Sequence, residues 1–151
     1  MSEAADALKA LIATSALGMG YDKRIGNAAL RPGPGWGGSC FPKDTLALLR
    51  AAEEAGVEQR IIATVVSVND DRKAAMVDRV ERALDGELRG KRIGILGLTF
   101  KPNTDDMRDA PSIPLIKALV ERGAEVTAFD PVGREQAEPL LPAITYATSP
   151  E

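Results

Sequence analysis

The residues of this 151-residue chain that could carry out chemistry gather between Arg31 and Asp44, in the stretch RPGPGWGGSCFPKD. Seven of the twelve residues from Arg31 to Pro42 are Gly or Pro, which predicts a shaped loop rather than a helix or a central strand. The one cysteine of the chain, Cys40, lies in this loop just before a helical pattern. Unpaired N–H groups at a helix N-terminus stabilise a thiolate, as does a nearby cation such as Lys43. The stretch therefore indicates a nucleophilic thiol beside a backbone nest that could admit an anion.

Two simpler interpretations compete with this one. A lone cysteine is most often a small buried hydrophobic residue, and a Gly/Pro cluster is most often only a turn. Each feature alone favours its simpler interpretation, and the combination favours a reactive site. The chain has no histidine, which removes Cys–His dyads, Ser–His–Asp triads and His-ligated metal from consideration. We expect no metal site.

Helices must position this loop on both sides. An Ala/Leu-rich helix is predicted over Ser2–Leu17, and a second one over Lys43–Ala55, which Gly56 ends. A third, long helix is predicted over Glu58–Leu84, about 40 Å in length. Its β-branched first half is also compatible with a strand, but the flanking charges favour a helix.

From Lys91 onward the pattern becomes that of a parallel sheet. Arg92–Leu98 is a short apolar run typical of a buried strand, and the polar loop Phe100–Arg108 follows it. A helix over Pro111–Arg122 and a second strand over Glu125–Phe129 complete a β-α-β unit with parallel strands and a right-handed crossover. Asp109 or Ser112 is the candidate N-cap of that helix.

The chain then continues with a short helix over Arg134–Leu140 and a third strand near Ile144–Ala147. The fold class is therefore α/β: a helical region over residues 1–89, then an incomplete Rossmann-like domain over residues 90–151. The run Gly94–Thr99, which begins within the first strand, reads GxxG and lacks the GxGxxG dinucleotide fingerprint. Gly94 and Gly97 are accordingly interpreted as sites of close strand-to-helix packing.

Three motifs in this order resemble one family. GWGGSCFPKD, from Gly35 to Asp44, closely resembles the GFGGSCFPKD loop of the UDP-glucose 6-dehydrogenases, within the nucleotide-sugar dehydrogenases. Trp36 replaces the usual Phe or Tyr. GYDKRIGN, from Gly20 to Asn27, and GLTFKPNTDDMR, from Gly97 to Arg108, are similar to segments of the same family. The RIGN segment favours UDP-glucose over the GDP-mannose and UDP-N-acetylmannosamine members.

The resemblance implies a role for each matching residue. Cys40 is the catalytic nucleophile, and Asp44 orients or activates the hydrolytic water. Arg24 reaches a neighbouring subunit's substrate, although a solvated arginine is the commoner fate of a single Arg. The cofactor NAD lies toward Lys43 and Arg108. The implied substrate-binding residues are Arg24, Gly35, Gly37, Gly38, Ser39, Phe100 and Lys101.

The resemblance also implies an activity and partners. The parent enzyme would convert UDP-glucose to UDP-glucuronate by two NAD-dependent oxidations, for polysaccharide biosynthesis, as a homodimer or higher homo-oligomer. Family enzymes begin with an NAD-binding Rossmann domain, so we expect this chain to be an internal piece that is inactive alone. The alternative is a non-catalytic helical dimerisation or nucleotide-binding module with a structural cysteine.

Composition sets wider bounds on the function. A net charge of −3 gives no indication of a nucleic-acid binder. No apolar run is long enough to span a membrane, and Met1 begins no signal-peptide pattern. A single cysteine fits a reducing compartment. The chain is therefore expected to be cytoplasmic, without a membrane partner.

Overall fold

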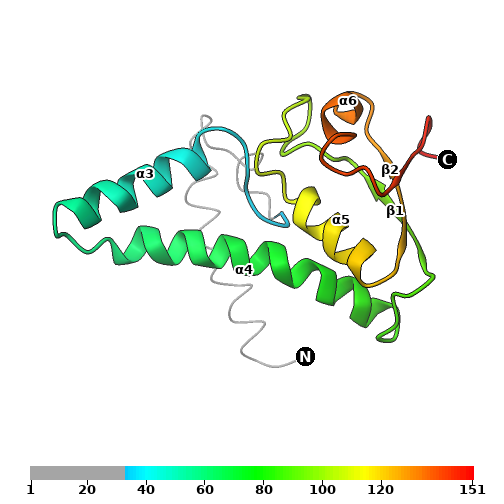
Figure 1. Ribbon diagram of the computed structural model, residues 1–151, viewed down its shortest axis with the longest axis horizontal. Helices are drawn as coiled ribbons and strands as arrows, with labels where there is room; N and C mark the ends of the chain where they lie inside the picture. The colour runs from blue at the N-terminus through cyan, green and yellow to red at the C-terminus, as the bar shows by residue number, and fades with distance from the viewer. Residues whose placement is uncertain (1–32) are drawn as a thin grey trace, which may run out of the picture. The chain divides into compact units, whose positions relative to one another are not determined.

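The computed structural model describes residues 33–151, of which Pro34–Glu151 form one compact unit (Figure 1). The helix predicted over Ser2–Leu17 and the predicted substrate contact Arg24 lie outside the described residues. The elements run in the order α3, α4, β1, α5, β2, α6 and β3. This α/β order is the one that the sequence predicts for this part of the chain.

One end of the unit is formed by two antiparallel helices, the longer of which continues toward the sheet (Figure 1). Helix α3 spans Phe41–Glu54 and helix α4 spans Arg60–Ala83, and the two pack along each other (Figure 1). The prediction of helix for the β-branched first half of α4 is confirmed. Helix α3 begins two residues earlier than expected, because Pro42 sits in its first turn, where the N–H that proline lacks would have no partner within the helix. Gly56, with a φ of 68°, follows the last residues of α3 and begins the connection to α4, as the predicted helix stop.

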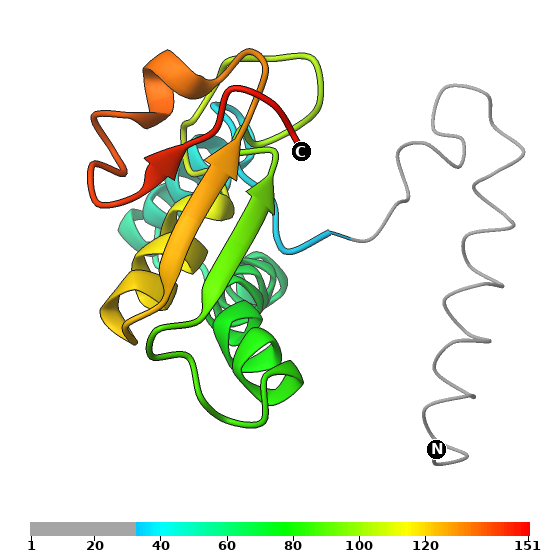
Figure 2. The ribbon, with the colours of Figure 1, turned by 90° about the vertical axis from the view of Figure 1, so that its right-hand side faces the viewer.

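A three-stranded parallel sheet forms the other end. Its strands are β1 (Arg92–Leu96), β2 (Glu125–Phe129) and β3 (Thr145–Tyr146), in that spatial order. Helix α5 (Ser112–Glu121) connects β1 to β2 and packs on β2, while α4 packs on α5 (Figure 2). The predicted parallel β-α-β unit is confirmed. The prediction that β1 is a buried strand is wrong for the described unit: its residues alternate between exposed and half-buried, because the helices α4 and α5 cover only one face of the sheet (Figure 2).

Three boundary predictions are corrected. Strand β1 ends at Leu96 rather than Leu98, because Gly97 turns the backbone with a φ of 90° and the N–H of Leu98 goes to the Asp130 carboxylate instead of to a strand. The short helix α6 covers only Arg134–Ala137 rather than reaching Leu140. Like β1, the third strand is shorter than predicted.

The predicted N-cap of α5 is also wrong. Pro111 occupies the cap position, and no side chain caps the helix. Ser112 already lies in the first turn, and its hydroxyl donates a hydrogen bond to the carbonyl of Leu98. Asp109 precedes the cap with a φ of 50°. The Ser112 bond therefore fastens the start of α5 to the end of β1.

The core lies between the sheet and helices α4 and α5. Its fully or nearly fully buried members include Val77, Leu98, Ile116, Leu119, Val126, Ala128 and Leu141. Arg122, just past α5, pairs with Asp78 (Nη2 to Oδ1, 2.8 Å) and with Glu81 on α4. These contacts join the helical hairpin to the sheet. Among the described helices, none combines the length and apolar character needed to cross a membrane.

Candidate functional site

The candidate nucleophile stands where the sequence predicts it, at the start of a helix. Cys40 is the N-cap residue of α3, is exposed, and makes no capping bond with its side chain. Its carbonyl accepts the N–H of Asp44 at 2.8 Å, which closes the first helical turn. The Ser39 hydroxyl lies 3.6 Å from the Cys40 sulfur. The thiol therefore faces solvent beside N–H groups of the first turn, which favour negative charge.

Helix α4 fastens the cysteine loop, residues Pro34–Cys40, from one side. The Asn69 side chain accepts the Trp36 N–H at 2.7 Å and donates to the Trp36 carbonyl at 3.3 Å. One turn further along, the Lys73 ammonium lies 5.8 Å from the centre of the Trp36 ring. A Cβ on Gly35 would come within 2.8 Å of the Lys73 side chain. The loop thus lies directly on the middle of α4.

The loop that follows β1, residues Gly97–Ala110, holds the cysteine loop from the other side. The N–H of Gly38 donates to the carbonyl of Arg108 at 2.7 Å. A Cβ on Gly37 would lie 2.3 Å from the carbonyl oxygen of Asp109, and one on Gly38 would lie 2.7 Å from the Phe100 ring. Two of the three sequence motifs therefore meet in space, and glycine at these positions permits the close approach.

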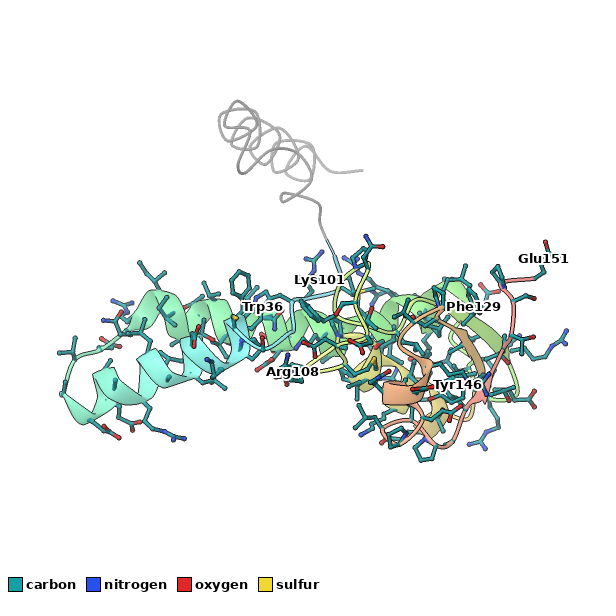
Figure 3. The ribbon with its side chains drawn as sticks, turned by 90° about the horizontal axis from the view of Figure 1, so that it is seen from above. Trp36, Lys101, Arg108, Phe129, Tyr146 and Glu151 are labelled. Carbon is teal, nitrogen blue, oxygen red and sulfur yellow. The ribbon has the colours of Figure 1, made fainter. Side chains whose placement is uncertain are left out.

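A charge pair orders the Gly97–Ala110 loop. Arg108 donates to both carboxylate oxygens of Asp106, with its shortest bond from Nη2 at 2.6 Å. This hydrogen bonding, together with the Arg108 backbone N–H, lowers the pKa of Asp106 to about 2. The same bonds raise the pKa of Arg108, and a charged Cys40 sulfur adds to that rise. Arg108 therefore interacts electrostatically with the Cys40 sulfur. Figure 3 shows Arg108 between the helical hairpin and the sheet.

Phe100 and Lys101 lie in the Gly97–Ala110 loop, next to its contact with the cysteine loop. The Lys101 ammonium lies 5.1 Å from the centre of the Phe100 ring, and the Phe100 N–H donates to the Asp106 carbonyl at 3.1 Å. Lys101 is exposed, while Phe100 is partly buried against Gly38. An apolar ring beside an exposed cation can accept a ligand that carries both a ring and an anionic group.

Asp130, at the end of β2, organises the loop before Phe100. One carboxylate oxygen accepts the N–H groups of Leu98 at 2.7 Å and Thr99 at 3.4 Å. The other accepts those of Val132 at 2.9 Å and Gly133 at 2.7 Å. Burial acts to raise the pKa of Asp130, but the four backbone hydrogen bonds together lower it. The carboxylate thus ties two loops at the carboxyl edge of the sheet.

Lys43 and Asp44 pair with each other in the first turn of α3. The Lys43 ammonium lies 3.3 Å from the Asp44 carboxylate, and the two side chains are 72% and 66% exposed. The Lys43 charge is therefore directed to a neighbouring carboxylate and to solvent. As an exposed pair it contributes little to stability.

The structure gathers most of the predicted site residues in one place. The glycines and Ser39 of the cysteine loop, Cys40, Phe100 and Arg108 are joined by the contacts described above, whereas Arg24 lies outside the described residues. Sequence reasoning missed Asn69, Lys73, Asp106 and Asp130 as supporting residues. A signal was present for Asn69: it is a polar residue on the buried stripe of α4, three residues after Val66 and eight before Val77.

The comparisons with known proteins agree with this arrangement. Residues 1–71 match the central domain of the UDP-glucose/GDP-mannose dehydrogenase family, and residues 94–151 match the UDP-binding domain of the same family. A fold of helical hairpin and parallel sheet that meet at a cysteine loop thus has the domain order of a nucleotide-sugar dehydrogenase. The chain belongs to the UDP-glucose/GDP-mannose dehydrogenase family.

Individual relatives point to one branch of that family. The chain is 52% identical over 135 residues to the UDP-glucose 6-dehydrogenase of Rhizobium meliloti (strain 1021), covering 89% of this chain and 31% of that protein. It is 48% identical over 131 residues to the UDP-glucose 6-dehydrogenase AglM of Haloferax volcanii, covering 87% of this chain and 30% of that protein. The chain therefore spans about a third of the length of these relatives.

Solved structures share the fold. A UDP-glucose dehydrogenase from Pyrobaculum islandicum superposes with a TM-score of 0.81 at 43% identity, over 91% of this chain and 32% of that one. A GDP-mannose dehydrogenase from Pseudomonas aeruginosa superposes with a TM-score of 0.68 at 24% identity, over 95% of this chain and 33% of that one. The second likeness concerns the fold alone.

Proposed function

We propose that the protein carrying this chain is an NAD-dependent UDP-glucose 6-dehydrogenase, which oxidises the C6 alcohol of UDP-glucose to the carboxylate of UDP-glucuronate. The observation that carries the proposal is the junction at the cysteine loop. There Gly38, two residues before the exposed Cys40 thiol at a helix N-terminus, contacts the Phe100 ring and the Arg108 carbonyl of the segment that matches a UDP-binding domain. The relatives of highest identity quoted above carry the same activity in their names.

Cys40 supplies covalent catalysis in this proposal. Its thiolate adds to the C6 carbon of the aldehyde stage, forming a C–S bond and a thiohemiacetal. Oxidation of that carbon gives a thioester, which water then hydrolyses to the acid while the thiolate leaves. The covalent bond keeps the aldehyde from escaping between the two oxidations. When bound, NAD⁺ supplies the hydride acceptor for both oxidations.

The surrounding residues position the substrate and the water. Asp44 lies one helical turn after Cys40, which puts its carboxylate on the same side of α3, where it orients the hydrolytic water. The Gly35–Ser39 backbone shapes the wall around the sugar. Phe100 and Lys101 hold the uridine and sugar side of the nucleotide.

Two exposed cations fit the cofactor. Arg108 is 67% exposed and Lys43 is 72% exposed, so an anionic pyrophosphate can reach both. The Asp106 pair holds the Arg108 guanidinium in one orientation, and a planar guanidinium suits bidentate contact with phosphate oxygens. Arg108 is thus proposed to hold the NAD pyrophosphate, with Lys43 as a second, more mobile cation.

The proposal includes a homodimer or higher homo-oligomer in the cytoplasm. Helix α4 exposes Ile61, Val65 and Val68 in the described unit, with 78%, 44% and 57% of their surfaces accessible. Apolar side chains in one row on a helix support packing against another copy of the protein. Arg24, outside the described residues, is proposed to reach the substrate of the neighbouring subunit. Sedimentation at micromolar concentration tests the assembly, and a strictly monomeric protein would contradict it.

The activity is tested with the full-length protein, UDP-glucose and NAD⁺. Oxidation of an alcohol to an acid releases two hydrides, so NADH should form in a two-to-one ratio to UDP-glucuronate. GDP-mannose and UDP-N-acetylmannosamine serve as competing substrates. No NADH with any of the three, together with a Cys40 thiol that UDP-glucose does not protect from alkylation, would favour a non-catalytic module instead.

A further inference from the structure

We infer that Asn69 of helix α4 is a positioning residue for the nucleophile: it fixes the cysteine loop so that Cys40 stands at its reacting position. This inference rests on the proposed function, because it concerns the thiol of that same site. Asn69 contacts neither the thiol nor, in the proposal, the substrate. It acts through the Trp36 backbone, four residues before Cys40.

The burial of Asn69 is the first support. Its exposed fraction is 4%. Among residues 33–151 it is the only buried residue with a polar side chain. An unpaired amide is costly to bury, whereas an apolar residue of similar size would pack into this helix face without that cost. The amide is satisfied by the N–H and the carbonyl of one peptide residue, Trp36. Its polarity therefore serves the loop rather than the helix.

The fit of the loop on α4 is the second support. A Cβ on Gly35 would come within 3.1 Å of the Asn69 carboxamide oxygen, so the backbone of the loop lies directly against this side chain. Two hydrogen bonds of opposite polarity to one residue fix both the position and the orientation of the loop backbone at Trp36. The loop cannot slide along α4 without losing both bonds.

Lys73, also on α4, contacts the Gly97–Ala110 loop as well as the cysteine loop. Its ammonium donates to the Asp109 carbonyl at 3.3 Å and lies over the Trp36 ring. Asp109 in turn abuts Gly37. One face of α4 therefore holds both the cysteine loop and the segment that carries Arg108, with Asn69 as its buried centre.

The test compares Asn69→Leu with Val77→Ala in the full-length protein. Val77 lies two turns further along α4, is equally buried at 4%, and belongs to the core beneath α5. Val77→Ala therefore lowers stability from the same helix without touching the cysteine loop. Asn69→Asp keeps the oxygen that accepts the Trp36 N–H but loses the donor to the Trp36 carbonyl, and it serves if Asn69→Leu does not fold.

We expect Asn69→Leu to lower kcat by about tenfold to a hundredfold, because a displacement of the order of 1 Å has such an effect on a positioned nucleophile. The KM for UDP-glucose should change less than kcat, since Phe100 and Lys101, which hold the nucleotide in the proposal, belong to another segment, and only the Gly35–Ser39 wall moves with the loop. Val77→Ala should keep the kcat of the unmodified protein even if its Tm falls as much as that of Asn69→Leu or more. The kcat of Asn69→Asp should lie between those of Asn69→Leu and the unmodified protein. An unchanged kcat in Asn69→Leu, or an equal loss in Val77→Ala, would overturn the inference.

Alkylation of Cys40 by iodoacetamide separates this inference from the proposed function. If the unmodified protein forms no NADH, the proposed activity fails, but the positioning of Cys40 is still measured by its alkylation rate. Alkylation should be slower in Asn69→Leu than in Val77→Ala, because a displaced cysteine loop moves the thiol relative to the N–H groups of the first turn of α3. Equal rates in the two variants would overturn the inference, whatever the activity.

Discussion

Gly37→Ala is the sharpest test of the junction at the cysteine loop. The added Cβ would lie 2.3 Å from the Asp109 carbonyl oxygen and 2.7 Å from the Asp109 carbonyl carbon. Both atoms belong to the backbone, so no side-chain rotation relieves the contact. A separation of 3.0 Å, below which real Cβ contacts essentially do not occur, needs a shift of about 0.7 Å between the cysteine loop and the Gly97–Ala110 loop.

This shift sets the expected magnitudes. Inserting one methyl group into a packed contact costs about 1–3 kcal/mol of unfolding free energy. A nucleophile displaced by somewhat less than 1 Å should lose up to about a hundredfold in rate. We therefore expect Gly37→Ala to lower kcat far more than its stability loss would suggest, because the methyl group separates the two walls of the site.

Gly56→Ala is the matched control. Gly56 has a φ of 68°, and a Cβ there would meet nothing within 4 Å. The substitution introduces backbone strain of about 1–2 kcal/mol at the turn after α3, away from the cysteine loop. Initial rates of NADH formation and Tm should be measured for both variants in the full-length protein. If Gly37→Ala retained kcat, or if Gly56→Ala lost as much, the packing of Gly37 against Asp109 would not position the thiol.

Four further predictions use the same protein. Cys40→Ser should abolish formation of the acid, because an alkoxide leaves less readily than a thiolate at the hydrolysis step; UDP-glucuronate detected by chromatography at the unmodified rate would contradict this. Arg108→Ala should slow alkylation of Cys40 more than Lys43→Ala does, since the Lys43 charge is paired with its neighbouring carboxylate; the reverse order would exclude Arg108 as the main cation at the thiol. The pKa of Asp106 is lowered from 3.8 to about 2, so its contribution to stability is complete above about pH 4 and lost as pH falls toward 2; Asp106→Asn should flatten the dependence of Tm on pH in that window, and an unaltered slope would refute the pairing. Asp130→Ala should lower stability by about 1–3 kcal/mol, because it leaves four backbone N–H groups without their acceptor; an unchanged Tm would show that water replaces the carboxylate.

Local patterns in the sequence predicted the elements and the place of the nucleophile. The apolar stripe of α4, the apolar run of β1 and the Gly/Pro content before Cys40 depend on neighbours within a few residues. Propensity and periodicity act over that range, so the parallel β-α-β unit and the position of Cys40 at a helix start were both predicted correctly. The end of β1 was not, because Leu98, the last residue of the predicted strand, bonds to Asp130, far along the chain.

Only the tertiary structure determined which residues contact the cysteine loop. Asn69 bonds to Trp36 from 33 residues away, and Gly37 packs against Asp109 across a still longer separation. Which residues of α4 face the loop depends on how the helix rotates and packs in the finished core, and no local preference fixes that rotation. The motif made Cys40 a candidate, but the contact partners that hold it exist only once the helical hairpin and the sheet have packed together.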